Sequence, residues 1–290
     1  MFGPSEWAFN GITNHHRSPD FHRFLRGLEE AFKRTFDIQE NWTVLFMPGG
    51  GTLANEIVLS SCVSEVVGPD LPFVERLRRL SRYSGRNHVW GGYNGPIIRA
   101  CVAYDTATST VLPVLPSDRM MTFADCVSSF PYYDIPVDVD AWSTVSGKQL
   151  GASPGIGILA LSPRFRTAVH SSSSRSILSL SDWLDFHDRG EQPHTPATQL
   201  LENLFDHISH FNVETLRKSI DERRNLLEKF VPADKYMGTG PVFTFLADAL
   251  PKSLVRKWDI YPGSVGPQLF LHAVGDWTGL LNDLKGIRWN

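Results

Sequence analysis

The sequence predicts an α/β protein, with a mainly parallel sheet in a large domain and a small α+β domain toward the C-terminal end. Short β-rich apolar runs alternate with longer segments in which apolar residues recur at three- and four-residue steps, the pattern of strands connected by helices. A chain of 290 residues is long enough for one large domain and a small one, and can bury a pocket. Hydrophobic residues make up 42% and charged residues 20%, which excludes a disordered chain or a coiled coil.

The first predicted elements are a helix, a strand, a turn and a second helix. Pro19 to Phe36 carries apolar residues at helical spacing, and Ser18 precedes it as a capping residue. Thr43 to Met47 is a short apolar run, for which we expect a strand, and Leu53 to Val63 has a helical pattern. The glycines between these two segments complete a strand–turn–helix unit.

The later segments continue the alternation. Strands are expected at 97–104, 121–124, 156–161, 242–247 and 268–273, and helices at 73–83, 198–208, 213–230 and 277–284. A serine-rich turn at 171–174 precedes the mostly helical last part, which has the pattern of a small α+β domain. No internal repeat and no long linker are present, so we expect the two parts to pack closely.

Charge and cysteine content exclude several classes of partner and site. A formal net charge of −3 provides no basic field for DNA or RNA, so no nucleic-acid partner is expected. The three scattered cysteines, Cys62, Cys101 and Cys126, match neither a disulfide framework nor a zinc motif, and the histidines lack metal-ligand spacing. No apolar run approaches the roughly 18 residues of a membrane helix, and the first residues lack a secretion signal. We therefore expect a soluble cytoplasmic protein without a metal ion.

The first chemical motif is the turn Pro48-Gly49-Gly50-Gly51-Thr52 between the predicted strand and helix. Glycines at this place let backbone N–H groups approach a phosphate, and the helix N-terminus adds partial positive charge. The spacing matches neither the nucleotide-binding P-loop nor the dinucleotide glycine motif. A phosphate site and a plain tight turn both remain open on this motif alone.

The second motif is a single lysine, Lys148, in the small-residue loop that precedes the strand at 156–161. An amine that loses contact with water has a lowered pKa and becomes a nucleophile able to form a Schiff base. The alternative is a solvated lysine on a loop.

The third motif is Asp125, at the end of an apolar strand 23 residues before the lysine. A carboxylate at that place can hold the pyridinium N–H of a cofactor that accepts electrons. The alternative is a cap for the turn that follows.

Together these motifs resemble the class V aminotransferases of the fold-type-I superfamily that depends on pyridoxal 5′-phosphate (PLP), the group of the phosphoserine, serine–pyruvate and 2-aminoethylphosphonate aminotransferases. The resemblance covers most of the chain, and its segments follow the family's order. They are His16-Arg17-Ser18-Pro19-Asp20-Phe21, the glycine turn through Thr52, Asp105–Thr110, Asp125 with Ser128-Ser129, Lys148 with Pro154-Gly155, and Gln192–Pro196. Against that family the chain is a short and divergent member.

The resemblance implies the fold-type-I architecture, an α/β/α large domain with a mainly parallel sheet and a small α+β domain. The large, PLP-binding domain would comprise residues 15–210, and the small domain residues 1–14 and 211–290. His194 and Thr195 match positions that reach the cofactor phosphate of the neighbouring subunit. The resemblance therefore implies a homodimer with its active site at the subunit interface.

The resemblance also implies a role for the residues that handle the reacting atoms. Lys148 would form a Schiff base with PLP and later move the proton at the substrate α-carbon. Asp125 would pair with the pyridine nitrogen of PLP and keep it protonated.

Four further positions would complete the cofactor site. Gly51 and Thr52 would bind the PLP phosphate through N–H groups and a hydroxyl. Thr106 would bind the ring hydroxyl, with Thr108 as the alternative, because the alignment is ambiguous by a small offset. Phe73 would stack on the ring, or else is an ordinary core aromatic that opens a helix.

Two positions depart from the family pattern. Gly147 precedes the lysine where relatives carry glutamine or a similar polar residue, so one expected phosphate contact is absent. Gln268 stands where relatives carry an arginine that clamps the substrate α-carboxylate through a bidentate pair. The neutral amide does not replace that clamp, which is worth about 1.5–3 kcal/mol for a hydrogen bond to a charged group.

Two explanations for the missing arginine remain open. Either another residue binds the substrate carboxylate, with Arg17 and its neighbour His16 as candidates from the His-Arg motif, or the substrate has no ordinary α-carboxylate there. His16 and Arg17 have a structural alternative as a pair at the entry of a helix that bonds to backbone carbonyls.

Three functions follow from these residues. The first is a PLP-dependent aminotransferase-like enzyme acting on an amino acid or amine in a specialised pathway. The second is a PLP-dependent lyase, or an elimination, replacement or carbon–carbon bond-forming enzyme, which uses the same lysine and aspartate without transamination. The third is a protein that holds PLP or a partner without catalysis, which the retained Lys148, Asp125 and glycine turn oppose.

Overall fold

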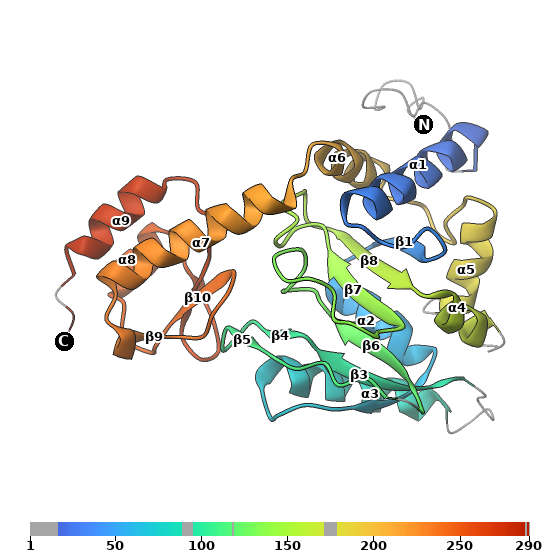
Figure 1. The fold of residues 1–290 in the computed structure, drawn as a ribbon, viewed down its shortest axis with the longest axis horizontal. Helices are drawn as coiled ribbons and strands as arrows, with labels where there is room; N and C mark the ends of the chain where they lie inside the picture. Colours follow the sequence, from blue (N-terminus) through green and yellow to red (C-terminus); the bar gives the residue numbers. More distant parts are fainter. Residues whose placement is uncertain (1–16, 89–94, 118, 171–178, 288, 290) are drawn as a thin grey trace.

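The computed structural model describes residues 17–88, 95–117, 119–170, 179–287 and 289, and its main sheet has six strands (Figure 1). These strands are β1 (Thr43–Pro48), β2 (Val63–Val66), β3 (Ile97–Val102), β6 (Met121–Asp125), β7 (Ala141–Val145) and β8 (Ile156–Leu161). The helices of this part are α1 (Pro19–Thr35), α2 (Gly51–Ser60), α3 (Pro72–His88), α4 (Pro163–His170), α5 (Leu180–Asp188) and α6 (Thr198–Ser209). A short hairpin of β4 (Tyr104–Asp105) and β5 (Thr110–Val111) lies beside the sheet.

The sheet has the order β1-β8-β7-β6-β3-β2 and is mainly parallel, as the sequence predicts. Strands β2, β3, β6 and β7 pair in parallel. Strand β8 is antiparallel to both of its neighbours, so β1 runs in the same direction as β7. The carboxyl ends of β1, β3, β6 and β7 therefore meet at one edge of the sheet, where open α/β sheets bind their ligands.

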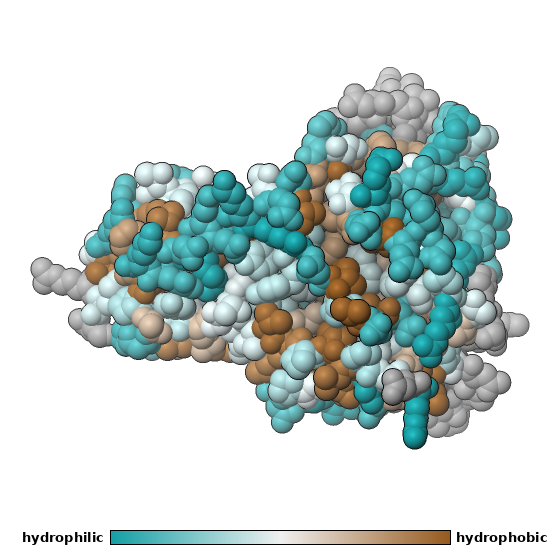
Figure 2. All heavy atoms as spheres, viewed as in Figure 1, coloured by the Kyte–Doolittle hydropathy of each residue, from teal (hydrophilic) through white to brown (hydrophobic). Residues whose placement is uncertain are grey.

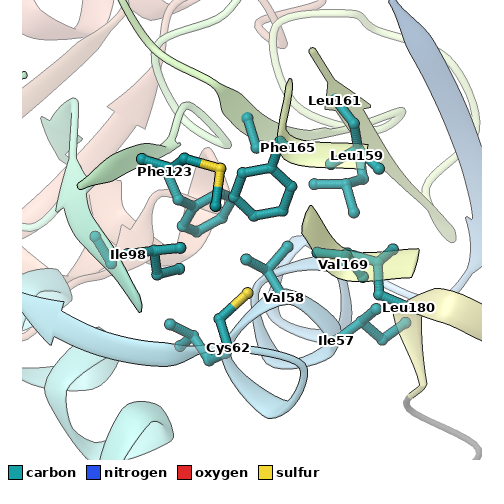
Figure 3. Packing of buried hydrophobic residues seen from close by; sticks show 14 of the residues in the cluster. Ile57, Val58, Cys62, Ile98, Phe123, Leu159, Leu161, Phe165, Val169 and Leu180 are labelled. Carbon is teal, nitrogen blue, oxygen red and sulfur yellow. The ribbon is translucent and has the colours of Figure 1, made fainter. Parts of the chain in front are cut away.

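Helices cover both faces of the sheet, because successive side chains of a strand point to opposite sides. Leu45 and Met47 face a core formed with α2, α3, α4 and α5, whereas Val44 and Phe46 face a core formed with α1 and α6. Figure 3 shows the first core, in which Ile57 of α2 lies among sheet residues and residues of α4 and α5. This layering is the α/β/α arrangement expected for the large domain.

The C-terminal part has a core of its own around a four-stranded sheet of order β11-β12-β10-β9. The strands are β9 (Tyr236–Met237), β10 (Val242–Phe245), β11 (Tyr261–Pro262) and β12 (Pro267–Phe270); the helices are α7 (Val213–Phe230), α8 (Lys252–Lys257), α9 (Trp277–Lys285) and the 3₁₀ turn η2 (Ala233–Lys235). In Figure 1 the long helix α7 reaches from the main sheet to this small unit. The proposed boundary near residue 210 stays a prediction, and residues 1–14, assigned to the small domain, lie outside the described part of the chain.

Two strands depart from the sequence-based expectations. The helix expected to run to Val63 ends at Ser60, and Val63 begins the edge strand β2. Strand β7 carries serine and threonine and lacks an apolar pattern, yet all five of its residues are buried. Its Ser143 hydroxyl donates to Asn55 Oδ1 at 2.5 Å, so a partner 88 residues away offsets the cost of burial. The expected turn at 171–174 falls outside the described residues.

The surface is unevenly polar. In Figure 2, hydrophobic side chains gather over the region where β3 and β4 lie in Figure 1, and hydrophilic side chains cover α7. Ile97, Val111 and Leu115 are among the exposed large hydrophobic residues of this part of the chain. Among the described residues, no helix is long and apolar enough to cross a membrane.

Candidate active site

A cavity of about 660 Å³ lies at the carboxyl edge of the main sheet and is closed on one side by the small unit. The cavity is lined by the glycine turn and Asn55, by residues of α3 and the ends of β3, β6 and β7, and by Tyr261, Ser264, Gln268 and Phe270 of the small unit. Asp125 and Lys148 both line this cavity. The parallel pairing explains their proximity, because Asp125 ends β6 and Lys148 follows β7, the next strand of the sheet.

The glycine turn forms the N-terminus of α2 and presents bare backbone to the cavity. A side chain added at Gly50 would meet nothing within 4 Å, whereas one at Gly51 would come within 2.4 Å of Val127. Gly49 has a φ of +142° that favours glycine, and its N–H donates to the carbonyl of Gly155 at 2.7 Å. The Gly49 N–H is thus already bonded, whereas Gly50 leaves space in front of the first N–H groups of α2, where a helix N-terminus can bind phosphate.

Lys148 lies deep at the floor of the cavity, with part of its side chain accessible from it. Its Nζ donates to Ser128 Oγ at 2.5 Å. Burial lowers the pKa of Lys148, and the charge of Arg76 lowers it further, whereas Asp125 opposes the shift. The structure thus provides a buried amine that gives up its proton more readily than a lysine in water.

Asp125 is the buried carboxylate of the site and is fixed by neutral donors. Its Oδ2 accepts from Asn55 Nδ2 at 2.6 Å, and its Oδ1 accepts from the N–H of Val127 at 3.0 Å. Burial raises the pKa of Asp125, and these donors together with Lys148 only partly offset that effect. The carboxylate would gain from one more cationic hydrogen-bond donor on its cavity side.

Thr106, and not Thr108, lines the cavity. The Thr106 hydroxyl donates to Ser128 Oγ at 2.5 Å, the same oxygen that accepts from Lys148. Thr108 instead donates through its N–H to Asp105 Oδ1 at 3.1 Å. The geometry therefore favours Thr106 of the two alternatives for the cofactor site.

Phe73 lies over the lysine, at the start of helix α3. Lys148 Nζ is 5.6 Å from the centroid of the Phe73 ring. The N–H of Phe73 donates to Asp105 Oδ2 at 2.8 Å, so a buried carboxylate of the β4–β5 hairpin holds the first turn of α3 in place. Phe73 is half-buried and also packs against the main core, so both interpretations of this residue have support.

Gln268 belongs to the wall that the small unit contributes. It is buried on β12, and its Nε2 donates to the carbonyl of Thr106 at 2.5 Å. The same amide lies 3.5 Å from Thr244 Oγ1. Gln268 thus connects the small unit to the main sheet at the place where the sequence pattern leads us to expect a substrate clamp.

The structure explains why Gly147 carries no side chain. A Cβ at this position would lie 2.6 Å from Pro154 Cβ and 2.8 Å from Pro154 Cα. Because a backbone atom is among the clashing partners, the loop has no room for the polar residue expected before the lysine. A side-chain contact to a phosphate from this position is therefore sterically excluded.

Of the predicted site residues that the structure describes, His194, Thr195 and Arg17 do not line this cavity. His194 and Thr195 are exposed, and the His194 ring lies 6.1 Å from that of Trp183 in an edge-on arrangement. Arg17 is exposed just before α1, and His16 lies outside the described residues. The roles suggested for these four residues stay predictions.

Three residues to which the sequence patterns assign no role complete the site. Asn55 of α2 connects Ser143 to Asp125, and Ser128 connects Lys148 to Thr106. Arg76 of α3 donates from Nη2 to Thr52 Oγ1 at 2.7 Å. Ser128 belongs to a sequence motif that already suggested cofactor binding. Asn55 and Arg76 lie inside helices, and no motif in the surrounding sequence indicates a role in binding.

Several solved structures with a similar arrangement of elements are aminotransferases. A phosphoserine aminotransferase from Cytophaga hutchinsonii superimposes with a TM-score of 0.73 at 17% identity, covering 94% of this chain and 90% of that one. An aspartate aminotransferase of subgroup IV from Thermus thermophilus has a TM-score of 0.73 at 20% identity, with coverage of 94% and 91%. A PLP-bound phosphoserine aminotransferase from Trichomonas vaginalis has a TM-score of 0.72 at 10% identity, with coverage of 97% and 94%.

The chain has the fold of these aminotransferases. The expected fold-type-I architecture is therefore confirmed. No family model and no curated protein matches the sequence. At 10 to 20% identity these neighbours establish the fold, and the chemistry of this chain has to be argued from its own cavity.

Proposed function

We propose that this protein is a PLP-dependent enzyme that acts on the amino group of a small substrate, as an aminotransferase. The observation that carries the proposal is one cavity that holds a buried lysine amine, a buried carboxylate and a bare glycine cradle at a helix N-terminus. An aldehyde-bearing cofactor with a pyridine ring and a phosphate fits these three groups. The aldehyde then meets the lysine amine, the pyridine N–H meets the carboxylate, and the phosphate meets the N–H groups of the glycine turn.

When bound, PLP supplies an electron-accepting ring that stabilises negative charge on the substrate carbon that loses a proton. Lys148 attaches the cofactor, and its lowered pKa leaves the amine free to take up the proton at that carbon and return it. Ser128 holds Nζ in position until the cofactor arrives. Asp125, fixed by Asn55, accepts the pyridine N–H and keeps positive charge on the ring.

The remaining residues orient the cofactor. Phe73 covers the side of the cavity above Lys148, and Thr106 offers its hydroxyl beside Ser128. The N–H groups of the glycine turn and the Thr52 hydroxyl bind the phosphate.

A titration with PLP followed by absorption spectroscopy tests the cofactor assignment. After unbound PLP is removed by gel filtration, we expect the wild-type protein to keep a visible band that borohydride treatment abolishes. Lys148→Ala should lack this protein-bound band, whereas Lys33→Ala, a lysine of α1 away from the cavity, should keep it. A wild-type protein that keeps no band after this step would contradict the proposal.

The type of reaction needs a second measurement. An aminotransferase converts its bound cofactor to the pyridoxamine form when an amino donor is added, and an oxo acid reverses the change. A lyase, an elimination or replacement enzyme, or a carbon–carbon bond-forming enzyme would release a product without that conversion. Screening amino donors for the loss of the visible band distinguishes these outcomes, and a product without pyridoxamine would replace transamination with one of these reactions.

We further propose that the protein acts as a homodimer. His194 and Thr195 are exposed and distant in sequence from the cavity residues, as expected of groups that serve a neighbouring subunit. The exposed hydrophobic residues over β3 and β5 provide apolar surface of the kind that a second copy covers.

A subunit-mixing experiment tests this assembly. Lys148→Ala subunits and His194→Ala/Thr195→Ala subunits should each bind PLP weakly alone. Mixed after dissociation, they should regain one tight site in each mixed dimer, because that site combines Lys148 with an unchanged His194 and Thr195. A monomeric mass by light scattering, or no recovery in the mixture, would rule the dimeric site out.

A further inference from the structure

The positive charges that line the cavity are unevenly placed. Among the described residues of its wall, the cationic side chains are Lys148, Arg76 and Arg79. The two arginines stand three residues apart on α3 and face the same cavity. Lys148 is committed to the reacting atoms in the proposed function, so the arginines are the remaining source of positive charge for an anionic group.

Arg76 and Arg79 differ in their hydrogen bonding to the glycine turn. Its Nη2 donates to Thr52 Oγ1 at 2.7 Å, across 24 residues of sequence. Arg79 makes no hydrogen bond to the turn within the described part of the chain. The charge of Arg76 also extends to the cavity floor, where it acts on both Lys148 and Asp125.

The glycine turn needs such a charge. The N-cap Gly50 has no side chain, so it adds no hydrogen-bond donor or charge to the turn. The helix N-terminus by itself offers only about half of a positive charge, whereas a phosphate ester near neutral pH carries between one and two negative charges. Gly147 has no room for a side chain that could add a donor from the lysine loop.

We propose that Arg76 is a ligand of the cofactor phosphate and supplies the positive charge that the glycine turn lacks. A guanidinium has five N–H donors in a planar fork, so one donor on Thr52 leaves others for phosphate oxygens. Because Arg76 is exposed toward the cavity and solvent, it reaches an incoming anion without breaking a core contact.

This inference rests on the proposed function, and equilibrium binding tests it without measuring turnover. The test compares the dissociation constants of PLP and of pyridoxal, which lacks the phosphate, for the wild type, Arg76→Gln and Arg79→Gln. We expect Arg76→Gln to weaken PLP binding by between about 10- and 100-fold and to leave pyridoxal binding within about twofold of wild type. Arg79→Gln is the matched control and should change neither constant by more than about twofold.

A further variant and three outcomes make the test decisive. Arg76→Lys keeps the charge but loses the planar fork, so its affinity for PLP should lie between those of wild type and Arg76→Gln. Equal weakening of PLP and pyridoxal in Arg76→Gln, or a PLP effect below about threefold, would overturn the phosphate assignment while leaving the proposed function intact. An equal PLP effect in Arg79→Gln would replace the specific contact with a general effect of positive charge. A wild-type protein that binds neither compound would overturn the proposed function together with this inference.

Discussion

Two carboxylates of the main α/β unit have pKa values shifted in opposite directions. Glu29 of α1 accepts from Lys33 at 2.9 Å, from His187 at 2.8 Å and from the N–H of Val44 at 3.0 Å. Burial alone would raise the pKa of Glu29, but these partners lower it to about 2. Asp125 has an amide and one backbone N–H as direct partners, and burial raises its pKa.

The opposite pKa shifts distinguish Glu29, whose charge stabilises the fold, from Asp125, whose charge is available to a bound ligand. Glu29 has its charge balanced inside the protein, so its ionised form stabilises the fold. Asp125 is held in place without a directly bonded cation, because the nearest amine, Lys148, donates to Ser128 instead. Such an arrangement costs stability in the free protein and favours a ligand that brings a positive N–H.

The largest effect is expected from the lysine beside Asp125. In the proposed function Lys148 attaches the cofactor and moves the proton, so Lys148→Ala should lower the turnover of the proposed amino-transfer reaction by about 10⁴-fold. Lys33→Ala, which removes the lysine beside Glu29, should lower the free energy of unfolding and leave turnover per folded molecule unchanged. Steady-state rates and urea denaturation of both variants check this contrast, and a Lys148→Ala protein with more than about 1% activity would contradict it.

Asp125→Asn should have the next largest effect on turnover. We expect a loss of between about 10²- and 10³-fold, since the proposed function assigns to this charge the task of keeping the cofactor ring protonated. The cofactor-free variant should be as stable as wild type or more stable, because the raised pKa means that the ionised form is unfavourable in the fold.

A graded control is available for Asp125. Ser143→Ala removes the hydrogen bond to Asn55, one step away from the carboxylate, and should lower turnover much less. Rates with saturating PLP, and urea denaturation of the cofactor-free proteins, measure both effects. A strong loss of stability in Asp125→Asn would mean that this carboxylate is structural like Glu29.

Glu29→Gln should have the reverse pattern. We expect the free energy of unfolding to fall on the order of 3 kcal/mol near neutral pH, from a pKa lowered from 4.5 to about 2, while turnover per folded molecule stays unchanged. Because the folded-state pKa is the lower one, this contribution is present above about pH 4.5 and is lost as the pH falls toward 2. Urea denaturation between pH 2 and 7 should show a weaker acid dependence in the variant, and equal slopes would contradict the assignment.

The smallest effect is expected at Gln268, in the wall contributed by the small unit. Gln268→Arg adds a cation but loses the amide bond to the Thr106 carbonyl. A charged hydrogen bond of about 1.5–3 kcal/mol, less about 1 kcal/mol for the lost bond, predicts a fall of about 2- to 30-fold in KM for donors with an α-carboxylate. Gln268→Met controls for size, and the same fall in that variant would show that charge is not the cause.

Local patterns predicted the parts of the site that stand next to a strand end. Asp125 and the glycine turn each follow an apolar run, whereas Lys148 precedes the apolar run of β8. Because β8 is antiparallel to its neighbours, all three lie at the same edge of the sheet. Asn55, Arg76 and Glu29 lie inside helices whose patterns report only which face is buried. Their roles depend on partners 70, 24 and 158 residues away, and no local pattern carries that information.

The sequence by itself determined the α/β class, the alternation of strands and helices, and the residues able to do amine chemistry, because these depend on short-range spacing and side-chain type. Tertiary structure alone decided three further points: that Thr106 rather than Thr108 lines the cavity, that Gly147 has no room for a side chain, and that Arg76 reaches the glycine turn. The physical reason is that pKa shifts, steric exclusion and hydrogen bonds depend on distances between elements. Those distances are set only when the two cores pack against the sheet.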